Sequence, residues 1–285
     1  DGGSTDNTVA ILETYQELLP LKIITAPGSN ISQGRNRAIS AAAGPIIAAT
    51  DAGVSLDPAW VGELVRPIEE GGAFVASGWF EADPITDFEV TMGATVLPET
   101  ADIDPQTFLP SSRSVAFRKE AWQAVGGYPE WLDYSEDLIF DLALQERYGP
   151  FPFAPKAVAY FRPRGNIKAF ARQYYLYARG DGKANLWPKR HAIRYGTYLI
   201  ALPILGRLIW GGHWLAWLAL LLGGGIYCRR PVQRLWPRVT AWSPQSRLRA
   251  LALIPVIRLV GDLAKMAGYP VGLAWRRRHR PNAGE

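Results

Sequence analysis

The sequence contains a single cysteine, Cys228, and three histidines that lie far apart. One cysteine excludes a disulfide framework and a multi-cysteine zinc site. The histidines show no HExxH spacing, so we do not expect a zinc hydrolase. Charged residues make up 20% of the 285 residues and hydrophobic residues 48%. This composition excludes the disordered and collagen-like classes.

Acidic residues are almost missing from the second part of the chain. Residues 166–285 contain 3 Asp or Glu against 20 Lys or Arg, a net charge of +17. Residues 1–165 contain 23 against 11, a net charge of −12, and only four of the 11 tryptophans. A basic, tryptophan-rich segment is typical of a protein that meets an anionic surface. Its apolar runs favour a membrane, and we do not expect nucleic acid as a partner.

The sequence has neither an initiator methionine nor a signal peptide with a basic start and an apolar core. It opens on residues 1–6, DGGSTD, which are typical of a turn. Because a domain rarely opens on a turn, we expect the natural protein to carry further sequence upstream.

Short apolar strands alternate with helical patterns over the first part of the chain. The patterns predict helices at residues 4–19, 34–43 and 58–70, and strands at residues 21–26, 45–50 and 73–80. This alternation is typical of βαβ units. It therefore predicts an α/β fold with a mainly parallel sheet.

Three polar clusters stand out against this background. Two of them, the opening turn and Asp51, follow the rule that ligands bind at the carboxyl ends of strands. Asp51 can hydrogen bond a ribose hydroxyl or contact a metal ion on a diphosphate. The third cluster is Glu136 and Asp137, at the start of a predicted helix whose dipole stabilises ionised carboxylates. Helix capping, a plain turn and ordinary helix-end charge are the alternatives for the three clusters.

Taken in order, these segments resemble family 2 glycosyltransferases of the GT-A fold. The resemblance covers residues 1–185. It rests on five segments: Asp1–Thr8 (nucleotide-binding turn), Gly34–Ile39 ("ARNxG"), Thr50–Gly53 (DxD position), Pro110–Arg118 with Val125–Pro129 (acceptor side) and Ser135–Asp137 (ED motif). Each segment alone is a weak signal, but five in the family's order and spacing are specific.

The resemblance implies transfer of a sugar from a nucleotide-sugar donor with inversion. Asp137 is then the general base that deprotonates the acceptor hydroxyl, and Glu136 orients the acceptor or tunes Asp137. The resemblance also assigns residues to the donor: Asp1 to the nucleoside, Asp51 to the ribose or a metal ion, and Arg35 and Asn36 to the donor's base or phosphates.

The acceptor or diphosphate side is assigned to Arg113, Gln173 and Arg179. For the last two, the alternative is a basic face that meets lipid headgroups. The QxxRW signature of processive synthases is absent, because residues 173–177 read QYYLY, which favours addition of a single sugar. A lipid-linked or cell-envelope glycan is the expected acceptor.

Two departures from the family bear on activity. Gly53 replaces the second DxD aspartate, which leaves Asp51 as the expected ligand of a divalent cation, Mg²⁺ or Mn²⁺. Metal dependence is therefore an open question. The family's first strand, first helix and second strand would precede Asp1, and we expect a chain that starts at Asp1 to lack activity.

Residues 195–228 form the longest apolar run, with Arg207 as the only residue charged at neutral pH. One interpretation is a membrane hairpin with arms at 195–211 and 212–228; another is a single span near 208–228. A buried, soluble helical hairpin is the third. Both flanks of the run are basic, which favours the hairpin with both ends in the cytoplasm.

Residues 248–275 are apolar but interrupted by charges and by Pro255 and Pro270. This pattern favours an amphipathic interfacial helix over a membrane span, with the basic tail 276–280 against anionic headgroups. The predicted organisation is thus a GT-A domain at 1–185 and a helical, membrane-associated region at 186–285. The catalytic domain would face the cytoplasmic side of the cell membrane.

A non-catalytic function is the competing hypothesis. A GT-A-like domain that has lost a DxD carboxylate could serve as a membrane-anchored scaffold for a partner enzyme. The Glu136-Asp137 pair argues against this hypothesis, because a scaffold does not need two adjacent acids at a helix start.

Overall fold

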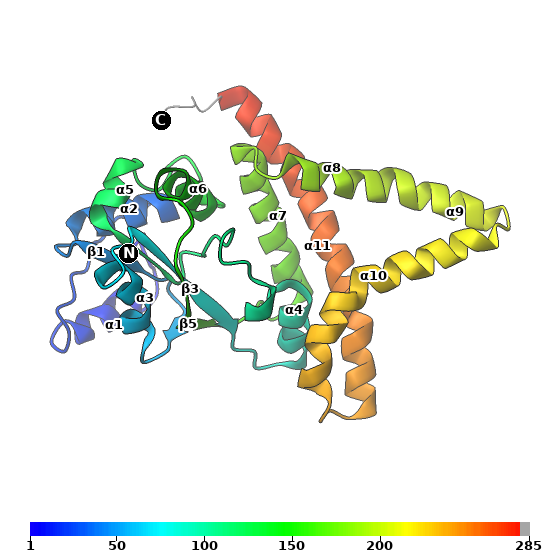
Figure 1. Cartoon of the computed structure of the whole chain (residues 1–285), viewed down its shortest axis with the longest axis horizontal. Helices are drawn as coiled ribbons and strands as arrows, with labels where there is room; N and C mark the ends of the chain where they lie inside the picture. Colours follow the sequence, from blue (N-terminus) through cyan, green and yellow to red (C-terminus); the bar gives the residue numbers. More distant parts are fainter. Residues whose placement is uncertain (280–285) are drawn as a thin grey trace. The chain divides into compact units, whose positions relative to one another are not determined.

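The computed structural model describes residues 1–279, which pack as two compact units (Figure 1). The first unit, here called the α/β unit, comprises residues 1–80 and 104–159. The second, the helical unit, comprises residues 81–103 and the chain from residue 160 onward. The boundary predicted after residue 185 lies inside the helical unit, because the helix at residues 167–184 packs along the last helix of the chain.

The sheet of the first unit has five strands in the order β1-β4-β3-β5-β2. Their bounds are β1 Ile46–Ala49, β2 Val54–Leu56, β3 Val75–Ala82, β4 Val115–Arg118 and β5 Phe153–Phe161. Strand β4 is antiparallel to both β1 and β3. The α/β class is confirmed, but the sheet is mixed rather than mainly parallel, because β4 enters between two strands that run the opposite way.

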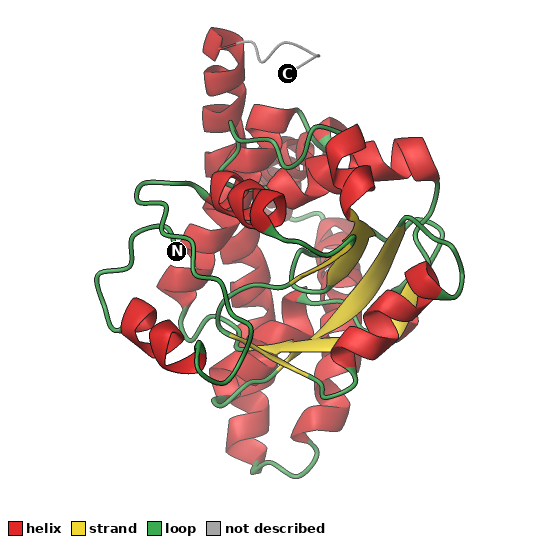
Figure 2. Ribbon diagram, turned by 90° about the vertical axis from the view of Figure 1, so that its left-hand side faces the viewer, coloured by secondary structure: helices red, strands yellow, loops and turns green. Residues whose placement is uncertain are grey.

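Both faces of the sheet are covered by helices, as Figure 2 shows for the strands in yellow. The helices of this unit are α1 Thr8–Tyr15, α2 Ile31–Ala41, α3 Trp60–Glu69, α5 Lys119–Ala124 and α6 Glu136–Tyr148. Side chains alternate between the faces along each strand. On β4, Val115 and Phe117 pack with α6, whereas Ala116 packs with α3.

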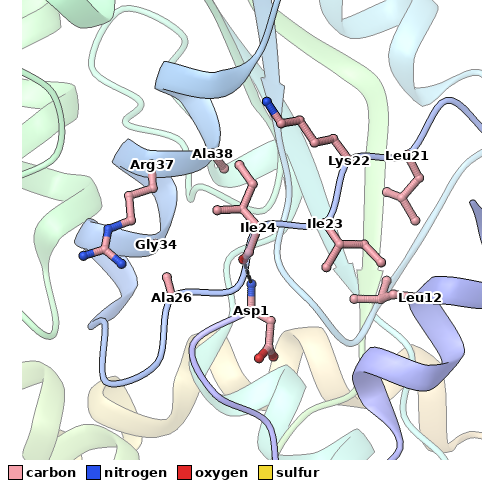
Figure 3. Close-up of a pocket in the computed structure, with 10 residues that line it drawn as sticks. All are labelled: Asp1, Leu12, Leu21, Lys22, Ile23, Ile24, Ala26, Gly34, Arg37 and Ala38. Carbon is pink, nitrogen blue, oxygen red and sulfur yellow. Dashed lines mark hydrogen bonds between the residues drawn. The ribbon is translucent and has the colours of Figure 1, made fainter.

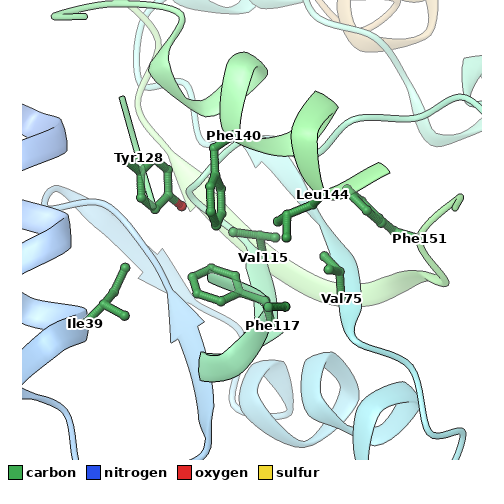
Figure 4. Packing of buried hydrophobic residues seen from close by; sticks show 9 residues of the cluster. Ile39, Val75, Val115, Phe117, Tyr128, Phe140, Leu144 and Phe151 are labelled. Atoms are coloured by element: carbon green, nitrogen blue, oxygen red, sulfur yellow. The ribbon is translucent and has the colours of Figure 1, made fainter. Parts of the chain in front are cut away.

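The larger core cluster lies beneath α6, where Phe140 is held between two other rings (Figure 4). Its ring stacks on Tyr128 with centroids 4.1 Å apart and meets Phe117 edge-on at 5.2 Å. Such aromatic pairs add about 0.5–1.5 kcal/mol beyond the area that they bury. This packing fixes the first turn of α6, which carries the two adjacent acids.

Two early elements differ from the sequence prediction. Helix α2 begins at Ile31 instead of residue 34, because Asn30 and Gln33 form a capping box that the pattern of apolar residues does not reveal. Residues 21–26 form no strand. Apart from local turn contacts, their backbone pairs with Asp1 through the hydrogen bonds Asp1 N to Ile24 O and Ala26 N to Asp1 O, and two bonds do not make a ladder.

The helical unit is built from long helices. They are α4 Asp87–Val96, α7 Ile167–Ala184, α8 Pro188–Gly196, α9 Leu202–Trp210, α10 Trp214–Val239 and α11 Pro244–His279, with a 3₁₀ turn at Thr100–Asp102. A π-helical turn, Thr197–Ala201, joins α8 to α9. The proline that follows at position 203 has no N–H to donate to the preceding turn, which accounts for the widened turn.

Helices α7 and α11 approach closely along a line of glycines. A Cβ added to Gly272 would lie 2.1 Å from the carbonyl oxygen of Arg179, and one on Gly268 equally close to that of Tyr175. Only residues without side chains allow backbones to pack at this separation. The α7–α11 pair is therefore the rigid centre of the helical unit.

Helices α8, α9 and α10 form a helical hairpin that turns at residues 211–213 (Figure 1). Gly212 has φ +81°, a left-handed conformation that ends α9. This break rules out a single continuous helix over residues 208–228. One helix of the described chain, Pro188–Trp210, is long and apolar enough to cross a membrane, with mean hydropathy 1.2 and no part of that window buried.

Helix α11 runs unbroken through Pro255 and Pro270 and covers the whole of the helix predicted at residues 248–275. Its buried face, which includes Ile254 and Ile257, packs against α4 and α7 and compensates for the backbone hydrogen bonds that proline removes. The location of 248–275 at a membrane surface stays a prediction. Of the basic tail, Arg280 lies outside the described residues.

Candidate active site

The two adjacent acids, Glu136 and Asp137, open helix α6 as the sequence predicted. The preceding residue, Ser135, has φ +65°, a left-handed conformation that is uncommon for residues other than glycine. Residues held in such conformations cluster at functional sites, because the surrounding structure must impose them. Ser135 thereby sets the direction in which the two acids leave the loop.

Arg35 on α2 joins the donor-side and acid clusters of the sequence. Its guanidinium donates to Glu136 Oε1 at 2.7 Å and, through Nη2, to Asp51 Oδ1. Arg113 Nε approaches the other Asp51 oxygen at 3.6 Å. The side chain of Arg35 is 13% exposed and that of Glu136 8%, so this is a largely buried ion-pair network. Four side chains that are far apart in the sequence therefore meet at one site: Arg35, Asp51, Arg113 and Glu136.

The acids at this place outnumber the cations. Burial raises the pKa of Asp137, and Arg35 opposes that shift. Burial and the neighbouring Asp137 charge likewise raise the pKa of Glu136. A carboxylate with a raised pKa is a stronger base, and general bases work best when their pKa lies near the operating pH. The arrangement therefore suits removal of a proton from a hydroxyl group.

Asn36, predicted to bind the donor, is fully engaged with the protein. Its oxygen accepts hydrogen bonds from Tyr128 N at 2.9 Å and Trp122 Nε1 at 3.0 Å, and its amide nitrogen donates to Tyr128 O at 2.8 Å. Gly127, with φ +78°, leaves room for this contact, since a Cβ there would lie 2.8 Å from the Asn36 oxygen. In this structure Asn36 fixes the loop that carries Tyr128.

Asp1 borders a small cavity of about 170 Å³ lined also by Leu12, Ile23, Ile24 and Arg37 (Figure 3). Its carboxylate is held in its own turn by Gly3 N at 2.8 Å and by Ser4, whose hydroxyl donates at 2.5 Å. Ligand pockets usually measure about 300–1,000 Å³, so this cavity by itself has room for only part of a nucleotide. The predicted role of Asp1 at the nucleoside stays a prediction.

Gln173 and Arg179, predicted for the acceptor or diphosphate side, belong to the helical unit, on α7. Gln173 donates to the Tyr177 hydroxyl at 2.6 Å. The backbone carbonyl of Arg179 lies against Gly272 of α11. These contacts are within their own unit. The α/β unit groups Arg35, Asp51, Arg113, Glu136 and Asp137, and the roles of Gln173 and Arg179 stay predictions.

The metal assignment rests on Asp51 alone. Among residues 1–279, no group of three or more His, Cys, Asp or Glu side chains is placed to hold a metal ion. Position 53 is a glycine with φ +78° and open space around it. Mg²⁺ is commonly held by one or two carboxylates plus substrate phosphates. The chain thus offers one carboxylate, and a cation here would need phosphate oxygens as its other ligands.

Two residues of the site were missed by sequence reasoning. Tyr128 lies beneath Arg35, whose guanidinium carbon is 5.3 Å from the ring centroid, and its hydroxyl hydrogen bonds Ser112 Oγ at 3.0 Å. Asp141 is 1% exposed, and neither of its oxygens has a hydrogen-bond partner. Burial and the Asp137 charge hold its pKa well above the usual range. The sequence does contain a signal for Asp141: it lies four residues after Asp137, a spacing that puts both acids on the same face of a helix.

The fold is an α/β fold of GT-A type, and comparison with known proteins agrees. Residues 1–121 match the sequence model of the family described as Glycosyl transferase family 2. This match over the first part of the chain supports a glycosyltransferase domain there. Comparison with curated protein sequences gives no match.

One solved structure supports the fold. A mannosyltransferase from Pyrobaculum calidifontis, solved in complex with GDP-Man and Mn²⁺, is 15% identical over 99% of this chain and 77% of its own, with a TM-score of 0.51. S. aureus TarS 1-349 is 16% identical over 98% of this chain and 80% of its own, with a TM-score of 0.48. At these identities, the mannosyltransferase bears on the fold alone.

Proposed function

We propose that this protein transfers a single sugar from a nucleotide-sugar donor to a lipid-linked or cell-envelope glycan acceptor, with inversion. The observation that carries the proposal is the Arg35 network, which brings Asp51 and Glu136 into one buried cluster beside Asp137. The match of residues 1–121 to the family 2 model supports transfer of a sugar. The neighbouring mannosyltransferase was solved with a nucleotide-sugar, which supports the same class of donor here.

Asp137 is the proposed general base. It takes the proton of the acceptor hydroxyl, whose oxygen then displaces the donor's diphosphate from the opposite side of the anomeric carbon. A single displacement of this kind inverts that carbon. Glu136 is anchored to Arg35, and burial raises the pKa of the adjacent Asp137. Ser135 sets the orientation of both acids.

The donor side is proposed to consist of Asp51, Arg35 and Arg113. The match to the family 2 model and the Mn²⁺ of the mannosyltransferase suggest a divalent cation, which would be held by Asp51 and by the donor's phosphate oxygens. Such an ion neutralises charge on a leaving diphosphate. Isothermal titration of the donor with and without chelator tests this assignment, and unchanged affinity would contradict it.

The choice of a lipid-linked acceptor rests on the helical unit. The hairpin of α8, α9 and α10 exposes large apolar side chains, with Trp210 94% exposed and Trp214 69% exposed. Tryptophans concentrate at the boundary between lipid and water. An enzyme that carries such a hairpin is suited to a substrate anchored in the same membrane.

The alternative, a non-catalytic scaffold, is separated from the transferase by one assay. A full-length protein, with whatever sequence precedes Asp1, is screened against nucleotide-sugars for thermal stabilisation. Donors that stabilise it are then tested for sugar transfer or donor hydrolysis. Turnover that disappears in the Asp137→Asn variant supports the transferase. Donor binding without any turnover, in wild type and variant alike, supports the scaffold.

We further propose that residues 195–228 enter the membrane as a hairpin with both ends on the cytoplasmic side, together with the catalytic domain. Exposed positions allow a direct test: Arg190→Cys, His213→Cys and Gln233→Cys, each in a Cys228→Ser background. An impermeant thiol reagent on intact cells is expected to spare positions 190 and 233 alike. Labelling of 233 but not 190 would show a single pass and contradict the hairpin.

A further inference from the structure

A second charged cluster lies in the helical unit, where α8 and α10 meet α11 at the base of the hairpin (Figure 1). At its centre is Asp262 on α11. Its Oδ1 accepts a hydrogen bond from Arg194 Nε at 2.8 Å. Its Oδ2 accepts from the hydroxyl of Tyr198 at 3.1 Å and from that of Tyr227. Both oxygens of this carboxylate are therefore in use.

Two further cations flank Asp262 on the same face of α11. Arg258 and Lys265 lie four residues before it and three after it, the spacings that bring helical side chains together. The Arg258 guanidinium lies 3.8 Å from the centroid of the Tyr227 ring, and its Nε is buried without a hydrogen-bond partner. Lys265 Nζ lies 4.7 Å from the centroid of the Tyr174 ring. Within residues 1–279, neither cation forms an ion pair with a carboxylate.

The charge balance of this cluster is strongly positive. Arg194, Arg258 and Lys265 share the single carboxylate of Asp262. The next acid, Asp181, is 3.2 Å from His191 Nε2, a ring whose other nitrogen lies 3.2 Å from Arg194. Burial, and then repulsion from Arg194, lower the pKa of Lys265 to about 8. Partly buried cations without anionic partners are unfavourable. An added anion would relieve this.

We propose that Arg258 and Lys265 form a binding site for a negatively charged phosphate group, distinct from the donor site of the α/β unit. Phosphate oxygens can accept from both side chains, and Arg is well suited to such contacts. Basic pockets between helices at a membrane boundary bind anionic lipid headgroups. The adjoining hairpin makes a lipid one source of this phosphate, and free phosphate in solution is the other.

The test measures thermal unfolding of the full chain in neutral detergent, with phosphatidylglycerol, inorganic phosphate, or chloride at matched ionic strength. The test variant is Arg258→Gln with Lys265→Gln. The matched control is Arg229→Gln with Arg230→Gln, which removes the same charge from exposed positions of α10. Wild type and control are expected to be stabilised. The test variant should bind the stabilising ligand at least about tenfold more weakly. Exchanging the two cations, Arg258→Lys with Lys265→Arg, should restore most of the response.

The outcomes separate the two sources. Stabilisation by inorganic phosphate and by the lipid supports a site for the phosphate group itself. Stabilisation by the lipid alone supports a site for a headgroup. If neither raises the unfolding temperature above that in chloride, or if the test variant responds like the control, the proposal is wrong. Donor binding measured in the same samples reports on the proposed function independently.

Discussion

The two units contain buried charge clusters of opposite balance. In the α/β unit, Arg35 is surrounded by the acids Asp51, Glu136, Asp137 and Asp141. In the helical unit, one acid, Asp262, is surrounded by the cations Arg194, Arg258 and Lys265. Burial, together with an excess of acids, raises carboxyl pKa values and produces a base, whereas an excess of cations calls for an anion. The excess charge thus indicates what each cluster would bind: a proton in the acidic cluster and a phosphate group in the basic one.

Removing the more buried of the two cations in the acidic cluster is expected to have the largest effect on stability. Arg35→Ala leaves Glu136 without its buried partner and Asp51 with Arg113 alone, and breaking a buried ion pair in this way costs about 3–5 kcal/mol of unfolding free energy. Arg66→Ala is the control, because Arg66 is 54% exposed and pairs with Glu63 on the same helix. It should cost about 1 kcal/mol or less. Equal losses in urea unfolding would show that the Arg35 network does not hold the site together.

The close packing of α7 against α11 at the glycines of α11 can be tested separately. Gly272→Ala places a Cβ against the Arg179 carbonyl and should destabilise the protein by about 1–3 kcal/mol through overpacking. Gly224→Ala on α10 has nothing within 4 Å of the added carbon and should be neutral or slightly stabilising. Donor affinity should not change in either variant. A loss of donor affinity in Gly272→Ala would mean that the two units are coupled.

Asp141 tests whether a surplus of acids explains the pH dependence of stability. Its folded-state pKa is raised well above the ordinary value of 3.8, so the stability that it contributes is present below that value and is lost as pH rises through the raised pKa. The Asp141→Asn variant has no titrating group at this position. Its unfolding free energy should therefore fall less as the pH rises, by about 1.4 kcal/mol for each unit by which the Asp141 pKa is raised. Parallel stability curves for wild type and variant, measured by urea unfolding across pH, would refute this.

The smallest effect on stability is expected at the tip of the hairpin. Replacing Trp210 and Trp214 together by serine should change unfolding free energy in detergent by no more than about 0.5 kcal/mol, because both are exposed. Association with liposomes should fall. Trp79→Ser, at 2% exposure, is the control and should cost about 3–5 kcal/mol. A large loss of stability in the tip variant would mean that Trp210 and Trp214 are buried by contacts within the protein and are not exposed.

Much of the fold could be predicted from local pattern. The strand at 46–49 and the helices at 60–69 and 136–148 agree with apolar periodicity and helix-end signals. The direction of β4 could not be predicted, because the sequence of a strand does not specify which neighbours it joins. The strand expected at 21–26 is absent, because a strand needs a ladder partner, and Asp1 supplies these residues with only two backbone hydrogen bonds.

The candidate site was predicted residue by residue but not as a network. Asp51, Glu136 and Asp137 carry visible motif signals, and the resemblance added Arg35 and Arg113. The ion pair that joins Arg35 to both Asp51 and Glu136 links positions 16 and 101 residues apart, which no local pattern reveals. Asp141 was overlooked because an acid on an amphipathic helix normally faces solvent. The assignment of Asn36 to the donor stays a prediction, and its hydrogen bonds hold the Tyr128 loop.

The central claim is that Asp137 acts as a base in the acidic cluster, and turnover of the full-length Asp137→Asn variant tests it most directly. Asp87→Asn is the control, since Asp87 occupies the first turn of α4 in the same way but is exposed. The account predicts that Asp137→Asn keeps the fold and the donor affinity but lowers kcat by ~10²–10⁴-fold, while Asp87→Asn has normal turnover. Wild-type activity should also fall on the acid side at a pH above 3.8, because burial raises the Asp137 pKa and the base must be ionised. Near-normal turnover in a folded Asp137→Asn variant would contradict the account.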